Sequence, residues 1–356
     1  MAKAEKTGKT ARKGRDFTFA DQVIAPGEIR TIDLPISRLS THQEVALPVR
    51  VLNGRRAGPV LFVSAGIHGD EIIGAEIIRR LLKLVSVDDL AGTLICIPVV
   101  NFFGFISHQR YLPDRRDLNR CFPGSSRGSL AAQLAHVFTE EIIRRSDYGI
   151  DLHSAGLHRT NLPQTRVTLD RPGALELARS FGAPVIVASR IRDGSMRQAA
   201  AECDVDVIVY ESGEALRFDE LAIRLGVKGI LRTMAYLGMG RRRNRKRPSS
   251  LYSRKTQWIR APEGGLFRAT KAAGDLVAAG DVIGYLSDPF GDIDDAVTSS
   301  VSGIIIGRSN LPVVNMGDAL MHIAQVERLE EGDDTPLERF AEEAFSDPLF
   351  DEDEVI

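Results

Sequence analysis

Short apolar runs that alternate with helix-like segments restrict the fold of this 356-residue chain more than any other feature of its sequence. The apolar runs predict buried strands at 60–64, 94–100, 149–153, 184–188 and 205–210. Apolar residues at helical spacing predict helices at 71–85, 129–145, 173–181, 195–202 and 219–237. This alternation is typical of an α/β domain with a largely parallel sheet. Because such sheets bind ligands at the carboxyl ends of their strands, we expect the chemistry in the loops 66–71, 101–124, 153–162 and 211–218.

The chain changes character at Gly240, after which a basic stretch (241–247) opens a predicted linker, 241–255. Residues 256–326 contain short strand-like runs and many glycines, without helical periodicity. Within them, 264–283 is weakly repeated by 303–320, which predicts a compact all-β barrel or sandwich with pseudo-twofold symmetry. The predicted organisation is a disordered basic tail (1–16), an α/β domain (17–240), the linker and the small β domain (256–326). A solvated, partly disordered acidic tail (327–356) follows, with one amphipathic stretch near 336–345.

Composition excludes several classes of function. Lys and Arg total 46 and Asp and Glu total 48, so the chain lacks the basic excess of a general nucleic-acid binder. No apolar run approaches the ~20 residues of a membrane-spanning helix. The polar, basic N-terminus has no hydrophobic segment, so we expect no secretory signal. Three scattered cysteines fit a reducing compartment, and we predict a cytoplasmic protein.

The strongest local signal is a His–Glu pair, His68 and Glu71, where a predicted strand gives way to a helix. Side chains three apart on a first helical turn lie on the same side and can converge on one metal ion. His153 ends another predicted strand, and two histidines with one glutamate form a catalytic zinc set that leaves a fourth position open. Taken without His153, His68 has a less favoured alternative role as a polar residue that caps the helix. Asp151 shares the face of His153 and is either a buried partner that orients it or a surface carboxylate.

A charged loop at 110–124 follows the strand predicted at 94–100. Its arginines and asparagine offer donors that can grip a carboxylate, and a further arginine can stabilise negative charge that develops on a carbonyl oxygen. An ordinary charged loop is the alternative, since several of its residues need no special role.

A third cluster lies at the end of the strand predicted at 205–210. Glu211 leaves an apolar run and would be partly shielded from water, which suits a general base. Glu214 lies beyond Gly213 and is more easily explained as a solvent-facing residue.

Four motifs in order resemble the succinylglutamate desuccinylase and aspartoacylase family, which is itself related to the zinc carboxypeptidases. The resemblance covers about residues 45–325 and rests on His68-x-x-Glu71, Arg110 followed by Asp117-Leu-Asn-Arg-x-Phe-Pro-Gly124, Asp151-Leu-His-Ser154 and Glu211-Ser-Gly213. It implies a carboxypeptidase-like α/β fold with a mixed sheet flanked by helices.

The same resemblance implies a role for each matching residue. It implies that His68, Glu71 and His153 bind one Zn²⁺ per chain and that Asp117 orients His68. It implies that Arg110 polarises the scissile carbonyl and that Asn119 and Arg120 hold the substrate carboxylate. It also implies that Glu211 is the general base and then the general acid.

The small C-terminal domain of such proteins resembles a biotinyl/lipoyl-like barrel. Lysine is absent between Gly284 and Met321, so no lysine there could carry biotin or lipoate, and we expect a lid or a specificity domain. Phe102 follows Asn101 where many relatives have proline, and residues 154–170 match no substrate-reading pattern. The acyl group therefore stays open.

We predict a zinc-dependent hydrolase that cleaves the amide bond of a small N-acylated amino acid or related amide. The alternatives are a metallocarboxypeptidase that acts on peptides and a non-catalytic binding protein that uses the basic stretch 241–247 for nucleic acid. That stretch lacks interleaved aromatic residues, which favours a solvated loop. We expect a small-molecule partner, neither nucleic acid nor membrane, and leave open whether the chain forms a homo-oligomer.

Overall fold

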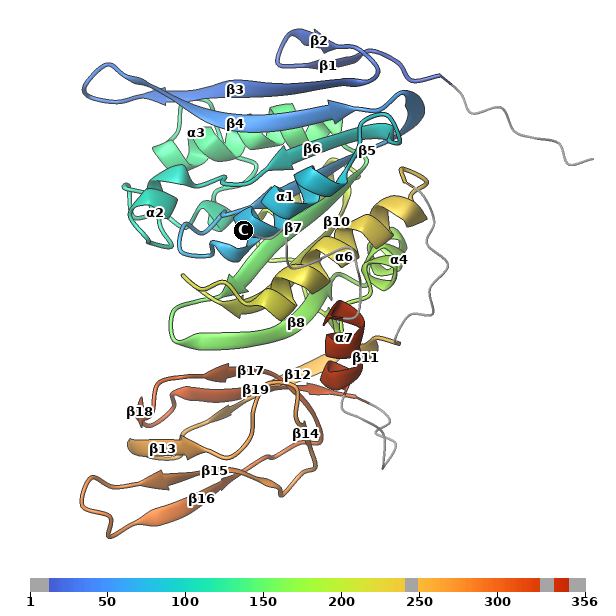
Figure 1. The fold of residues 1–356 in the computed structure, drawn as a ribbon. Helices are drawn as coiled ribbons and strands as arrows, with labels where there is room; N and C mark the ends of the chain where they lie inside the picture. The colour runs from blue at the N-terminus through green and yellow to red at the C-terminus, as the bar shows by residue number, and fades with distance from the viewer. Residues whose placement is uncertain (1–12, 241–248, 327–335, 346–356) are drawn as a thin grey trace, which may run out of the picture.

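One large mixed sheet with helices on both faces organises the chain (Figure 1). The structure, a computed structural model, describes residues 13–240, 249–326 and 336–345. The basic stretch 241–247 and the first twelve residues of the predicted N-terminal tail therefore lie outside the described residues. Within the described part of the chain, no helix has the length and apolar character needed to cross a bilayer.

The centre of the sheet is parallel and its flanks are not. Four neighbouring strands run in parallel, in the order β10 (Asp206–Glu214), β7 (Tyr148–Ala155), β5 (Arg56–Ala65) and β6 (Ala91–Ile97). Antiparallel β4 (Glu44–Asn53) and β3 (Glu28–Arg38) continue the sheet beyond β6, and β8 (Arg159–Val167) flanks β10. A short hairpin of β1 (Phe17–Phe19) and β2 (Gln22–Ile24) precedes them. The sheet is thus mixed, as the resemblance implies, rather than largely parallel.

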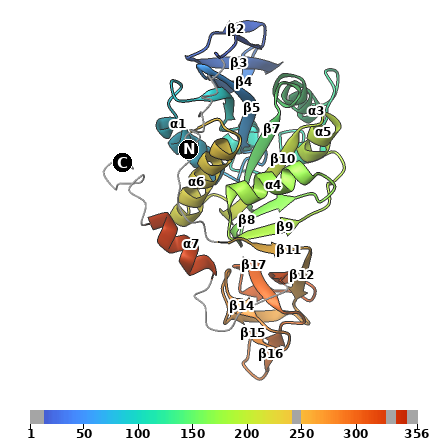
Figure 2. The ribbon, with the colours of Figure 1, turned by 90° about the vertical axis from the view of Figure 1, so that its right-hand side faces the viewer.

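Two hydrophobic cores lie on opposite faces of this sheet because successive strand residues point to opposite sides. On β5, Phe62 belongs to one core, and Leu61 and Val63 belong to the other. Figure 2 shows α1 and α6 on one side of the sheet and α3 and α5 on the other. The bounds are α1 (Ile73–Leu84), α3 (Leu130–Val137), α4 (Pro172–Phe181), α5 (Met196–Glu202) and α6 (Glu220–Tyr236).

Several predicted elements differ from the structure at their ends. The strand predicted at 94–100 ends at Ile97, where Pro98 removes a ladder donor. The helix predicted at 129–145 is divided into α3, a π-helical turn (Phe138–Ile142) and a 3₁₀ turn (Ile143–Arg145). The irregular stretch after residue 100 contains a short helix, α2 (Phe102–Ile106), and a 3₁₀ turn, η1 (Leu118–Arg120).

The loop predicted at 153–162 is limited to residues 156–158, because β7 continues to Ala155 and β8 begins at Arg159. β10 likewise continues into the predicted loop 211–218, with a register shift after Glu211. β9 (Val185–Ala188) pairs in parallel with β8, and β11 (Leu251–Ser253) with β9, so the described end of the predicted linker is a strand.

The all-β character of the C-terminal segment (residues 256–326) is confirmed. Its strands β17 (Gly303–Ser309), β19 (Ala319–Gln325) and β12 (Lys255–Arg260) extend the large sheet beyond β8. A second sheet contains β16 (Asp294–Thr298), β15 (Val282–Ser287), β13 (Gly265–Ala269) and β18 (Val313–Val314).

The two copies of the weak repeat exchange short strands. β14 (Leu276–Val277), from the first copy, pairs with β17 of the second, and β18 of the second pairs with β13 of the first. This reciprocity matches the expected pseudo-twofold symmetry, whereas closure of the two sheets into a barrel stays a prediction. The two sheets share one hydrophobic core, which includes Phe267, Ile283 and Ile323.

The amphipathic stretch expected in the acidic tail forms α7 (Pro336–Phe345). Phe340 and Ala344 are buried and share a cluster with Leu225 of α6, so this part of the tail is packed rather than solvated.

Candidate active site

A tight turn between β5 and α1 carries the first two candidate metal ligands. Helix α1 begins at Ile73. His68 and Glu71 therefore lie in the turn before the helix, whereas the sequence predicted them on its first turn. The amide of Glu71 donates to the carbonyl of His68 at 3.1 Å and closes the turn. Gly69 packs so closely that a Cβ there would lie 1.9 Å from the carbonyl carbon of Gly104. The segment around α2 therefore holds the turn in place.

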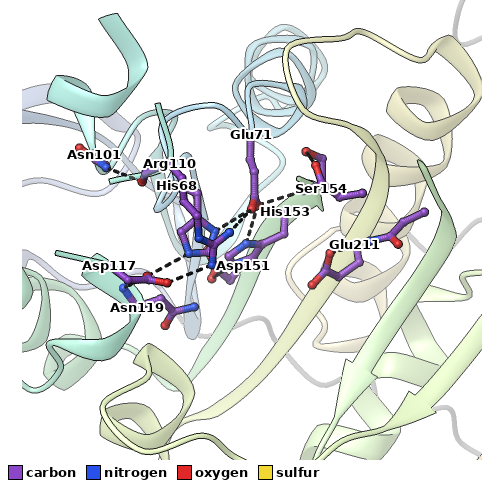
Figure 3. Close-up of polar contacts among 12 residues, drawn as sticks. His68, Glu71, Asn101, Arg110, Asp117, Asn119, Asp151, His153, Ser154 and Glu211 are labelled. Atoms are coloured by element: carbon purple, nitrogen blue, oxygen red, sulfur yellow. Dashed lines mark hydrogen bonds and ion pairs between the residues drawn. The ribbon is translucent and has the colours of Figure 1, made fainter. Parts of the chain in front are cut away.

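The structure brings His68, Glu71 and His153 together (Figure 3). Glu71 lies between the two imidazoles, with Oε1 2.7 Å from Nδ1 of His68 and Oε2 2.7 Å from Nδ1 of His153. One potential ligand atom from each residue lies within 4.8 Å of the others, and all three side chains are buried. Three residues from two distant segments thus form one compact donor set, as expected from the sequence.

Each imidazole is also held from its other side. Nε2 of His68 lies 3.1 Å from Asp117 Oδ1, and Nε2 of His153 lies 2.6 Å from Asp151 Oδ2. Asp151 is itself buried and accepts a hydrogen bond from the hydroxyl of Ser64 at 2.8 Å. Asp151 is therefore the buried partner of His153, and the two aspartates turn both Nδ1 atoms toward Glu71.

The carboxylates and imidazoles of this cluster shift one another's pKa values toward the charged forms. Burial raises the pKa of the Glu71 carboxyl, but His68 and His153 outweigh burial and hold it well below its usual range. Burial lowers the pKa of His153, and Asp151 and Glu71 reverse this effect and raise it well above the ordinary value. The result is a carboxylate held between two imidazoles, and zinc takes this donor set with both imidazoles in their neutral form.

Arg110 lies in the same cluster. Its guanidinium donates to Glu71 Oε1 at 3.2 Å and to Asp117 Oδ2 at 3.0 Å. Asn101 caps α2 and donates to the backbone carbonyl of Arg110 at 3.2 Å, which fixes where the arginine leaves the backbone. A positive group is therefore held beside the candidate metal ligands.

Asn119 and Arg120 follow Asp117 in the chain, but their side chains contact backbone groups outside this cluster. Oδ1 of Asn119 accepts from the amide of Met196 at 2.9 Å and ties η1 to the start of α5. Arg120 is exposed and donates to the backbone carbonyl of Asn119. Their role in holding a substrate carboxylate stays a prediction.

Strand pairing brings Glu211 to the cluster. On β10, Glu211 is the register partner of His153 on β7, and the register shifts directly after it. Its carboxylate accepts from Nδ2 of Asn161 at 3.0 Å and lies 3.6 Å from Nε of Arg166. Glu214 instead accepts from the amide of His158 and from Asn310, each at 3.0 Å, and is thus a link to the C-terminal segment.

Sequence reasoning missed Asn161 and Arg166, the two partners of Glu211. Both lie on β8, whose polar residues and Pro163 gave no strand pattern. Their position shortly after the Asp151-Leu-His-Ser154 motif was the available signal.

A known protein family shares the part of the chain that carries these residues. The sequence model of the succinylglutamate desuccinylase/aspartoacylase catalytic domain matches residues 57–237, just over half of the chain and all the candidate site residues. This chain belongs to that family. The family assignment confirms the resemblance carried by the four motifs.

Individual proteins also match most of the chain. An N-alpha-acetyl-L-2,4-diaminobutyric acid deacetylase from Halomonas elongata is 29% identical over 317 residues, which cover 83% of this chain and 90% of the relative. A succinylglutamate desuccinylase/aspartoacylase from Rhodobacter sphaeroides has 26% identity and a TM-score of 0.74 over 89% of this chain and all of its own. The product-bound ectoine utilization protein EutE from Ruegeria pomeroyi has a TM-score of 0.76 at 22% identity, over 89% of this chain and 99% of its own, and shares the fold.

Proposed function

We propose that this family member is a zinc-dependent hydrolase that cleaves the amide bond of a small N-acylated amino acid or a related amide. The observation that carries the proposal is the buried His68, Glu71 and His153 set, whose ligand atoms lie within 4.8 Å of one another. The relative from Halomonas elongata, a deacetylase of an N-acetylated amino acid, supports the reaction class. N-acetyl amino acids are therefore the first substrates to test.

The donor set fits zinc. His68, Glu71 and His153 would hold one Zn²⁺ per chain, through two imidazole nitrogens and a carboxylate that are already oriented by Asp117 and Asp151. When bound, the ion would supply Lewis acidity and lower the pKa of a water molecule.

The chain's own residues would carry the remaining steps. Glu211 would accept the proton of the attacking water and return it to the nitrogen of the departing amine. Arg110 would donate to the oxygen of the scissile carbonyl as negative charge develops there. Asn119 and Arg120 would hold a carboxylate of the substrate. The contact between Glu211 and Asn161 supports this assignment, because it fixes one carboxylate oxygen.

Metal analysis combined with a panel of N-acyl amino acids tests the proposal. We expect one equivalent of metal in the wild type and in Glu211→Gln, with turnover at least ~100-fold lower in the variant because a general base is lost. Glu214→Gln is the matched control, since Glu214 contacts His158 and Asn310 and should leave turnover near that of the wild type. Full turnover in metal-free protein, or in Glu211→Gln, would contradict the mechanism.

A further inference from the structure

A cavity of about 560 Å³ lies at the amino-terminal ends of β5 and β6, whereas the candidate active site lies toward the carboxyl ends of the parallel strands. A volume of this size can hold a small organic molecule. β5 begins at the cavity with Arg56 and leads, at its other end, to the turn that carries His68. The length of β5 therefore separates the cavity from the candidate metal ligands.

The segment just before β1 forms one wall of this cavity. The amide of Gly14 donates to the carbonyl of Arg55 at 2.8 Å, and Nδ2 of Asn53 donates to the carbonyl of Arg15 at 2.9 Å. These contacts hold residues 13–16 against the sheet, although the sequence predicted that they belong to a disordered tail.

Three cationic side chains line the cavity, those of Lys13, Arg15 and Arg56. Lys13 forms a β-bridge with Arg56, and alternate residues of such extended backbone share a face, so Lys13 and Arg15 reach the same cavity. Arg56 donates to the backbone carbonyl of Asp89, which is a neutral acceptor. Among the residues that the structure describes, no carboxylate forms an ion pair with any of the three.

The negative charge at the cavity is smaller than this positive charge. Asp16 is the one carboxylate among the described residues that line it. Asp147 lies beside the cavity and already accepts from the amide of Val60 at 2.8 Å. Three cations against one carboxylate leave two positive charges in excess, so an anion with two negative charges would be the matching ligand.

Part of the lining is bare backbone. Residues 57–59 of β5 stand opposite Gly92 of β6, so β5 bulges there and the ladder is interrupted. A Cβ on Gly58 or on Gly92 would lie within 2.6 Å of the backbone of the neighbouring strand, so no larger residue fits at either position. Phe17 and Val60 add apolar surface to the same cavity.

We propose that this cavity binds a small molecule that carries a phosphate group. A phosphate dianion matches the two positive charges in excess, and guanidinium groups bind phosphate oxygens through paired hydrogen bonds. The volume exceeds that of a phosphate ion, and Phe17 and Val60 offer apolar surface to an organic group, so we expect a phosphate monoester rather than free phosphate. The proposal is independent of the deacylase function, because the two sites lie at opposite ends of β5.

Isothermal titration calorimetry of the full-length protein with phenyl phosphate, benzenesulfonate and inorganic phosphate tests the proposal. Phenyl phosphate and benzenesulfonate have similar shapes and different charges, and inorganic phosphate lacks the organic group. We expect phenyl phosphate to bind with a Kd below about 1 mM, at least about threefold tighter than either of the others. Arg15→Gln and Arg56→Gln should each weaken it about 3- to 10-fold, because contacts of exposed charges are partly screened by solvent.

Two further variants use the same probe. Asp16→Asn removes the carboxylate of the lining and should tighten the binding of phenyl phosphate about two- to fivefold, because a repulsive charge is lost. Arg55→Gln removes a neighbouring cation that already pairs with Asp88, and should leave the Kd unchanged. The contact of Arg15 with Asn53 uses the backbone carbonyl, so Arg15→Gln should keep the thermal midpoint of the unliganded wild type.

The outcomes separate this cavity from the candidate active site. A Kd for phenyl phosphate that is unchanged in both Arg15→Gln and Arg56→Gln would place the bound phosphate elsewhere and overturn the proposal. Absence of binding at about 1 mM phenyl phosphate, or equal binding of benzenesulfonate, would also overturn it. Inorganic phosphate that binds as tightly as phenyl phosphate, and is weakened by the same two variants, would support the phosphate site and identify free phosphate as its ligand.

Discussion

Each histidine of the candidate metal cluster has its own aspartate, and the two aspartates reach it in different ways. Asp151 precedes His153 by two residues on β7, so the strand itself sets their contact. Asp117 reaches His68 from the turn η1, 49 residues further along the chain. The orientation of one imidazole is therefore local, whereas that of the other depends on tertiary structure.

Asp151→Asn should weaken zinc binding about 10- to 100-fold, because removing a carboxylate that orients a metal-bound histidine has an effect of that size. Competition with a chromophoric chelator measures the change. Asp147→Asn is the control, since Asp147 lies just before β7 and accepts from the amide of Val60. An Asp151→Asn protein that holds zinc as tightly as the wild type would show that this contact does not tune the site.

Gly69 is required by close packing rather than by its backbone angles. Gly69→Ala places a Cβ against the backbone of Gly104, so we expect a loss of about 1–3 kcal/mol in the free energy of unfolding and weaker metal binding. Chemical denaturation and metal titration measure the two effects. Gly156→Ala, where a Cβ meets nothing within 4 Å, should change neither.

At the scale of elements, β8 joins the candidate site to the C-terminal segment. Asn161 is the register partner of Gly213 on β10 and of Gly307 on β17. Its amide donates to Glu211, and a Cβ on Gly307 would lie 2.9 Å from its Oδ1. The C-terminal segment thus borders the residue that holds Glu211, the proposed general base.

Asn161→Ala and Gly307→Ala should each lower kcat about 3- to 10-fold, the equivalent of one hydrogen bond, with the metal content unchanged. Steady-state kinetics on metal-loaded protein provides the measurement. Gly264→Ala is the control in the same segment, because its nearest neighbour would be 3.5 Å from the new Cβ. Unchanged kcat in both test variants would argue that Glu211 needs no support from β8.

The same strand shows where prediction from the sequence stops. α1, β7 and β10 have apolar patterns that follow from burial on local faces, so these elements and the candidate site residues at their ends were predictable. β8 carries Pro163 and Arg166 and is a strand because β10 and β17 pair with it from distant parts of the chain. Its contribution to the site, Asn161 and Arg166, is visible only once that pairing is known.

At the scale of the whole molecule, a buried histidine couples stability to pH. The ring of His322 on β19 stacks on Trp258 at 4.4 Å and 6°. Burial, and then the charge of Arg166, lower the pKa of His322 to about 3. The folded protein therefore keeps this imidazole neutral where an unfolded chain would protonate it.

The free energy of unfolding should fall as the pH is lowered from about 6.5 toward 3, because the unfolded chain binds a proton that the folded protein rejects. The contribution of His322 is roughly 1.4 kcal/mol per pH unit at most. Urea denaturation at several pH values should give a flatter profile for His322→Gln than for the wild type. His136→Gln on α3 should keep the wild-type slope, and a His322→Gln profile as steep as the wild type would contradict the assignment.

The pairing of β17 with β8 also bears on how the protein is made. Residues 159–161 of β8 lie far earlier in the chain than their partners at 307–309. A ribosome that has synthesised only the first 240 residues has therefore produced a β8 that pairs with β9 at 164–167 but has no outer partner at 159–161. Unpaired edges of this kind recruit other strands, including those of neighbouring nascent chains. A truncated gene product that ends before residue 303 should therefore collect in inclusion bodies, where the full-length chain would not.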